Sequence, residues 1–211
     1  MALYRSGPVL VETLGADSVQ AGYLNLALGL FLLAYVTLSQ FAQGLIPALS
    51  GLRARGRPEQ GRAWLSNFVR VGWLLGWLSA AGVWLAADWA TPLVFGPAFQ
   101  PAAAALKWIS LGLPVAALLW AGNVAATVAG RGRVKFGASL AALLSFLAAG
   151  LLLIPAYGAA GAALALVLAV AAHVAVLSLA LQPEFRLEWA ALWPGGTAGG
   201  LGLLLVLWLG G

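Results

Sequence analysis

The stretch AGYLNLALGLFLLAYVTLSQFAQGLIPALSGLRARGRPEQG, residues 21–61, decides the fold, because a long apolar run in it ends in a cluster of arginines. No charged residue occurs from 21 to 52. A run of about 20 predominantly apolar residues is enough for a helix to cross the roughly 30 Å hydrocarbon layer of a bilayer. The stretch therefore predicts a transmembrane helix followed by a basic loop.

The composition of the whole chain agrees with this interpretation. Of the 211 residues, 63% are hydrophobic and 8% are charged, whereas roughly a quarter of the residues in soluble domains are charged. So few polar side chains could not cover the surface of a water-soluble protein of this size. The chain has no cysteine, which excludes disulfides, thiol nucleophiles and thiolate metal sites. We therefore expect an all-α integral membrane protein that is embedded in the lipid bilayer.

We expect two parts along the chain: a partial helix or re-entrant segment at 1–19, and a six-helix transmembrane lobe at 20–211. The expected spans are 20–48, 67–87, 106–129, 136–154, 158–181 and 191–210. Arg5 belongs on the inner side, yet the first span must begin on the outer side, and few residues connect them. The simplest interpretation of 1–19 is the end of a longer helix whose beginning lies before Met1.

Basic residues alternate between the connections. The connections 51–66, 130–135 and 182–190 carry Lys or Arg, whereas DWATPLVFGPAFQP (88–101) and PAYGAAG (155–161) carry none. Because Lys and Arg are retained on the cytoplasmic side during insertion, the basic loops are expected to be cytoplasmic. The sequence pI of about 10.3 therefore indicates membrane topology, and no nucleic-acid partner is expected.

A few polar side chains lie within the expected spans and are candidates for a substrate path. Arg70, one turn inside the second span, either snorkels to the headgroups or forms a cationic group that meets an anionic substrate. His173, in the middle of the fifth span, is either a hydrogen-bonded packing residue or a proton carrier. The uncharged amides at membrane depth are Asn25, Gln40, Gln43 and Asn123. These amides need partners, so they join helices or face a wet cavity rather than lipid.

The sequence does not predict an enzyme. It contains no paired carboxylates, no metal-ligand cluster and no phosphate-binding loop, so neither a metal nor a cofactor is expected. His173 and Ser178 lie roughly 140° apart around a helix and do not form a Ser–His pair. Lys107, near the outer side, is expected to be solvated.

Prolines and small residues suggest helices that bend and pack closely. Pro47 and Pro114 each remove one backbone hydrogen bond and favour a kink within a span. Gly158 and Gly161 open the fifth span, where small residues let helix backbones approach closely. Kinked helices with small faces and scattered polar groups suit a cavity that opens and closes.

Three stretches follow one another in an informative order. Residues 21–61 contain Gly-Tyr, an apolar helix, Pro-Ala-Leu-Ser and a basic loop. LVFGPAFQPAAAAL (93–106) contains a Phe-Gly-x-x-Phe element before small residues, and GRGRVKF (130–136) precedes LLLIPAYGAAGAALA (151–165). Together these stretches resemble the Wzx-like polysaccharide flippases, in the exporter superfamily that also holds multidrug antiporters and lipid II flippases.

The resemblance implies a multi-pass protein of the bacterial inner membrane that moves a lipid-linked oligosaccharide for surface polysaccharide synthesis. Such flippases have about twelve to fourteen helices in two lobes, so this chain would correspond to the C-terminal lobe. A missing N-terminal lobe or a second chain would then complete the substrate passage. The resemblance assigns structural roles to Pro47, Phe95, Gly96, Phe99, Pro155, Tyr157, Gly158 and Gly161. The alternatives are one lobe of a cation-coupled multidrug exporter, or a membrane assembly subunit that transports nothing.

Overall fold

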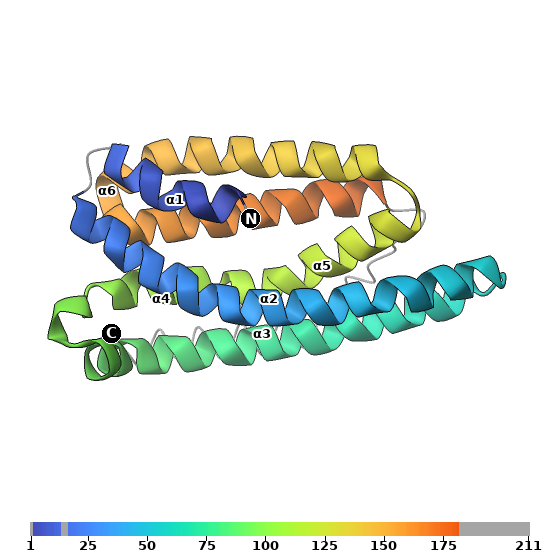
Figure 1. The fold of residues 1–211 in the computed structure, drawn as a ribbon, viewed down its shortest axis with the longest axis horizontal. Helices are drawn as coiled ribbons and strands as arrows, with labels where there is room; N and C mark the ends of the chain where they lie inside the picture. The colour runs from blue at the N-terminus through green and yellow to red at the C-terminus, as the bar shows by residue number, and fades with distance from the viewer. Residues whose placement is uncertain (1, 14–16, 182–211) are drawn as a thin grey trace.

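The computed structural model describes residues 2–13 and 17–181, which form six α-helices and one 3-10 helix and contain no strand. The elements are α1 (Ala2–Thr13), α2 (Ser18–Ala54), α3 (Pro58–Phe95), η1 (Pro97–Phe99), α4 (Ala102–Ser110), α5 (Gly112–Val128) and α6 (Gly132–Ala180). The long helices lie side by side along one axis (Figure 1). The expected all-α fold is confirmed, while the connection 182–190 and the sixth span at 191–210 lie outside the described residues.

Several of these helices can cross a bilayer. Among the described residues, α2, α3 and α6 are each long and apolar enough, and α4 and α5, which are bent by 41° where they meet, pass the same test together. At 1.5 Å per residue, α2 and α3 are each about 55 Å long, well beyond the hydrocarbon thickness. Helix α3, which contains the second expected span at 67–87, therefore extends past that span at both ends. The chain is an all-α integral membrane protein.

The bend in the third span falls at Leu111, between α4 and α5. Pro114 is the third residue of α5, and its ring would clash with the carbonyl of the residue four positions earlier, Ser110, where α4 ends. The helix is therefore interrupted just before the proline. Pro47, by contrast, lies within the continuous helix α2 and does not interrupt it.

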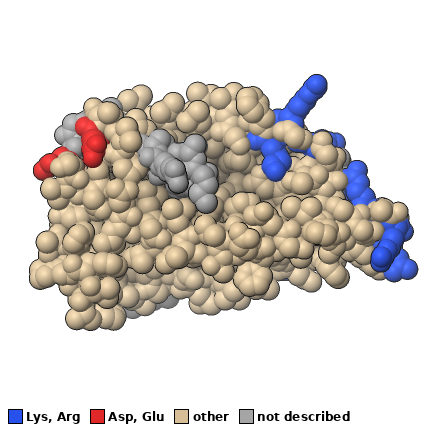
Figure 2. Space-filling model, in the orientation of Figure 1, with Lys and Arg blue, Asp and Glu red and all other residues tan. Residues whose placement is uncertain are grey.

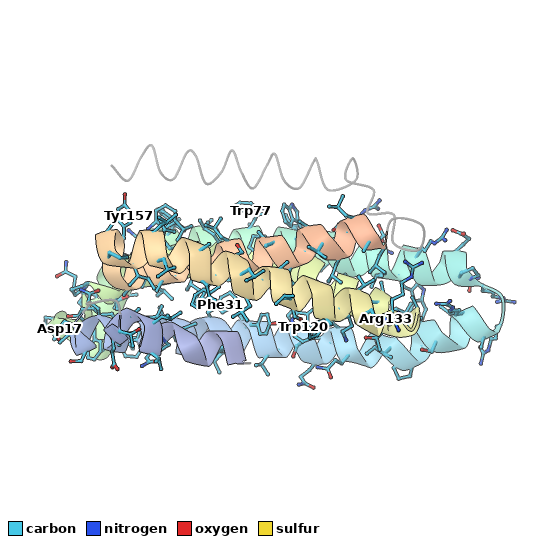
Figure 3. All side chains as sticks on the ribbon, turned by 90° about the horizontal axis from the view of Figure 1, so that it is seen from above. Asp17, Phe31, Trp77, Trp120, Arg133 and Tyr157 are labelled. Carbon is cyan, nitrogen blue, oxygen red and sulfur yellow. The ribbon has the colours of Figure 1, made fainter. Side chains whose placement is uncertain are left out.

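Helix α6 reverses direction at Gly158, whose backbone has φ 53° and ψ −127°. Its two limbs, 132–157 and 159–180, lie side by side and run antiparallel (Figures 1 and 3). The expected loop between spans four and five is therefore almost absent, because Pro155 and Tyr157 still belong to the first limb. The backbone N–H of Ala159 donates to Gln20 Oε1 of α2 at 3.2 Å, which satisfies one of the donors that a helix start leaves open.

The core consists of two groups of buried apolar side chains. The first lies between α1, α2, α4 and α6 and includes Phe31, Ile109 and Phe146. The second lies between α2, α3, α5 and α6 and includes Val69 and Leu177. Much of α5 is buried alanine and glycine, which brings its backbone close to the neighbouring helices.

Charged residues separate to the two ends of the bundle (Figure 2). Arg53 Nη1 donates to the carbonyl of Val128 at 3.0 Å, so the basic connections 51–66 and 130–135 lie at one end, which we name the basic end. Lys107 lies at the other end, where it pairs with Asp88 and stands 5.7 Å from the centre of the Trp84 ring. Lys107, which we expected to be solvated, is only partly so, because its side chain is 21% exposed and bonds to Asp88.

Candidate functional site

One face of α2 is uncovered by the described residues and carries glycines and amides. A side chain at Gly22, Gly29, Gly44 or Gly51 would meet nothing within 4 Å. Asn25, Gln40 and Gln43 are exposed. At 100° per residue, all seven positions fall within about 60° of one line along the helix. We name this surface, Gly22, Asn25, Gly29, Gln40, Gln43, Gly44 and Gly51, the α2 polar face.

The α2 polar face is unsuited to contact with lipid chains. A side-chain amide without a hydrogen-bond partner costs several kcal/mol in hydrocarbon, roughly 2–7 depending on the reference state. Neither Gln40 nor Gln43 makes a hydrogen bond within the described part of the chain. Leu33, which is 69% exposed, and the exposed Pro47 lie in the same sector of the helix, so the face is mixed rather than wholly polar. Its amides fit a water-filled passage or a second protein surface.

Arg70 lies on α3 at the same depth as Gln40. The two helices run antiparallel (Figure 1), and a Cβ at Gly72 of α3 would lie 4.0 Å from Leu38 Cδ1 of α2. Two residues further toward the basic end, Arg70 is therefore level with Gln40. Its side chain is exposed. The Arg70 guanidinium and the Gln40 amide thus lie at about one depth of the bundle, and Gln43 follows one turn further toward the basic end.

Asn123 and His173 belong to other helices than α2. Asn123 is half-buried in α5, and its Nδ2 donates to the carbonyl of Leu119 in the same helix at 2.9 Å. His173 is in the second limb of α6, and its Nε2 is buried without a hydrogen-bond partner in the described part of the chain. The structure therefore divides the predicted path residues: Gln40, Gln43 and Arg70 are exposed within about one turn of depth, whereas Asn123 and His173 are partly buried in other helices.

The Phe-Gly-x-x-Phe element forms a tight connection between α3 and α4. Gly96 has φ +97°, a conformation that favours glycine, and the rings of Phe95 and Phe99 lie 6.4 Å apart. Tyr23 of α2 donates its hydroxyl to the carbonyl of Ala98 at 3.0 Å and meets Phe99 edge to face at 6.2 Å. These contacts hold the connection against α2.

The Pro-x-Tyr-Gly-x-x-Gly element forms the reversal of α6. A Cβ at Gly161 would come within 2.2 Å of the backbone oxygen of Leu153, so only glycine allows this approach. Tyr157 is 66% exposed and Pro155 is also exposed. The hydrogen bond from Ala159 to Gln20 was not predicted, because 139 positions separate the two residues and no local signal connects them.

These elements define an integral membrane protein with an exposed helix face on which glycines and amides lie beside apolar side chains. No group of His, Cys, Asp and Glu residues in the described ranges could hold a metal ion. No family model, curated protein or solved structure matches the chain.

Proposed function

We propose that this chain is one lobe of a transporter that moves a lipid-linked oligosaccharide across the bacterial inner membrane for surface polysaccharide synthesis. The α2 polar face carries the proposal, because it presents hydrogen-bonding amides and open glycines at membrane depth. A sugar head needs such a wall, since crossing hydrocarbon without hydrogen bonds is prohibitively costly. The lipid tail stays in the bilayer.

The other wall of the passage belongs to a second lobe, either an N-terminal one or one supplied by a second chain. Rocking of the two lobes would then expose the α2 polar face to each side in turn. The basic end, which we assign to the cytoplasm, attracts the pyrophosphate of the substrate. Arg70 meets it at the level of Gln40, because an arginine binds phosphate through two parallel hydrogen bonds.

The transport proposal is tested with the complete transporter in a strain that lacks its own flippase. In the double variant Gln40→Leu/Gln43→Leu, we expect surface polysaccharide to fall at least about tenfold at unchanged protein abundance, as expected for the loss of hydrogen bonds made during transport. Gln100→Leu is the matched control, because Gln100 is exposed in the connection between α3 and α4. Normal polysaccharide in the double variant would refute the assignment of the α2 polar face.

Arg70 is tested in the same strain. Arg70→Gln is expected to reduce polysaccharide strongly and Arg70→Lys only partly, because an ammonium keeps the charge but not the two-bond geometry. A snorkelling arginine would instead tolerate Lys fully, and Gln would lower membrane abundance rather than transport.

A second candidate function is a non-transporting assembly subunit. The four open glycines of the α2 polar face favour it, because small residues allow a partner helix to approach closely. Gly44→Leu separates the two functions, since it blocks a close helix but keeps every amide. Loss of a co-purifying partner with no effect of Gln40→Leu/Gln43→Leu would favour the assembly subunit.

A further inference from the structure

A cavity of about 120 Å³ lies at the basic end, where the end of α2, the start of α3 and the end of α5 meet. Leu49, Leu65, Ala125 and Val128 give it apolar walls, and Arg53 and Arg62 contribute guanidinium groups. A Cβ at Gly61 would lie 3.3 Å from Leu49 Cδ2, so glycine lets the start of α3 approach α2 closely beside the cavity. The cavity is therefore amphiphilic.

Arg53 is held at the cavity by a bond to a neighbouring helix, and Arg62 by an ion pair within its own helix. Arg53 Nη1 donates to the carbonyl of Val128, the last residue of α5. Arg62 Nη1 forms an ion pair of 2.7 Å with Glu59 in the first turn of α3. A guanidinium has five N–H donors, so the bond to the Val128 carbonyl orients the Arg53 group and leaves other donors for a ligand, while Arg62 adds positive charge to the lining. Figure 2 shows that Lys and Arg gather at this end of the molecule.

We propose that this cavity binds the phosphate of an anionic lipid. Arginine donors match phosphate oxygens, and the apolar walls match the first methylenes of the attached chain. Basic pockets between helices on the cytoplasmic side of a membrane protein are suited to lipid headgroups. A bound lipid would join the α2–α3 hairpin to α5 at their shared end. This inference rests on the fold and does not depend on the transport function.

Two sources could supply this chemistry: a phospholipid of the bilayer, or a polyprenyl phosphate that carries a glycan. Both present a phosphate ester on an apolar chain. Purified full-length protein in neutral detergent is titrated with phosphatidylglycerol, with undecaprenyl phosphate, and with inorganic phosphate. Phosphatidylcholine serves as the zwitterionic control lipid. Binding is followed by native mass spectrometry and by the shift in unfolding temperature.

The variants separate this cavity from general positive charge. Arg53→Gln is expected to weaken binding of the anionic lipid about tenfold, since loss of one charge-assisted contact has roughly that effect. Arg55→Gln is the matched control, because Arg55 is an exposed arginine of the same connection that does not line the cavity. Ala125→Leu fills the cavity without changing charge and is expected to prevent binding while circular dichroism stays helical.

The two lipids identify the source, and the variants decide the proposal. Tighter binding of phosphatidylglycerol indicates a bilayer lipid, and tighter binding of undecaprenyl phosphate indicates a substrate-type lipid. Either result supports binding in the cavity if Arg53→Gln and Ala125→Leu weaken the binding of that lipid. Equal weakening by Arg53→Gln and Arg55→Gln, or full binding to Ala125→Leu, would overturn the proposal. Binding of phosphatidylcholine as tight as that of the anionic lipids would overturn it as well.

Discussion

At the scale of single residues, the reversal of α6 depends on two glycines, which have no side chain, and on one glutamine. Gly158 adopts a positive φ that L-residues rarely accept. Gly161 lets the second limb touch the backbone of Leu153. Gln20, from a different helix, accepts the hydrogen bond of the Ala159 N–H. The two limbs are therefore joined without a polar loop.

The first prediction concerns Gly161. Gly161→Leu is expected to destabilise the protein by about 3 kcal/mol or more, because overpacking in a closed site typically costs 1–3 kcal/mol and here the obstacle is backbone. The measurement is the yield and unfolding temperature of the protein in detergent. Gly29→Leu is the control, since nothing lies within 4 Å of a Cβ there. Equal stability of the two variants would contradict the close contact.

At the scale of elements, α3 and α5 approach through glycine. A Cβ at Gly76 would come within 2.5 Å of backbone atoms of Pro114, and a Cβ at Gly72 within 2.7 Å of the Cβ of Ala117. Pro114 lies directly after the bend between α4 and α5, so α3 packs against the point where the third span changes direction. Close backbone approach of this kind is how helices associate in lipid, where apolar contact alone gives little advantage.

The second prediction tests this helix contact. Gly76→Ala adds only a methyl group, yet it is expected to cost about 1–3 kcal/mol because Pro114 backbone atoms occupy its space. Gly82→Ala, on the same helix with open space, is expected to be neutral or slightly stabilising, since alanine is the better helix former. Unfolding in denaturing detergent measures both variants. A reversed order of stability would mean that α3 and α5 are not in contact at this point.

At the scale of the whole molecule, the bundle has two chemically different ends. Arg133 lies at one end and Asp17 at the other (Figure 3). The bond from Arg53 to the Val128 carbonyl and that from Arg131 to the Ala180 carbonyl tie the basic end together. Because positive charge is retained in the cytoplasm during insertion, this arrangement predicts that the basic end faces the cytoplasm.

The third prediction is the orientation itself. The chain has no cysteine, so single cysteines report position without a background. Arg57→Cys and Arg133→Cys are expected to be protected from a membrane-impermeant thiol reagent in intact cells, whereas Gln100→Cys at the opposite end is expected to react. Permeabilised cells provide the control for reactivity at all three sites. Labelling of Arg57→Cys from outside intact cells would reverse the topology.

What the sequence determines by itself is the class of protein and the positions of its charges. Apolar runs of span length require a helix in lipid, since every backbone group must be satisfied internally, and the alternating basic connections bring 51–66 and 130–135 to one end. In the described residues, glycine with a positive φ also marks changes of backbone direction, at Gly56, Gly96, Gly130 and Gly158. These features follow from local composition, so they can be read before any fold is known.

Only the tertiary structure decides which polar residues act together. Gln40 and Asn123 look alike in sequence, yet Gln40 is exposed on α2 while the amide of Asn123 is satisfied by Leu119. The cap of Ala159 by Gln20 and the cavity between Arg53 and Arg62 also require helices from distant parts of the chain. Exposure and partnership depend on how helices pack, and helix packing in lipid is governed by close contacts between small residues that periodicity does not reveal.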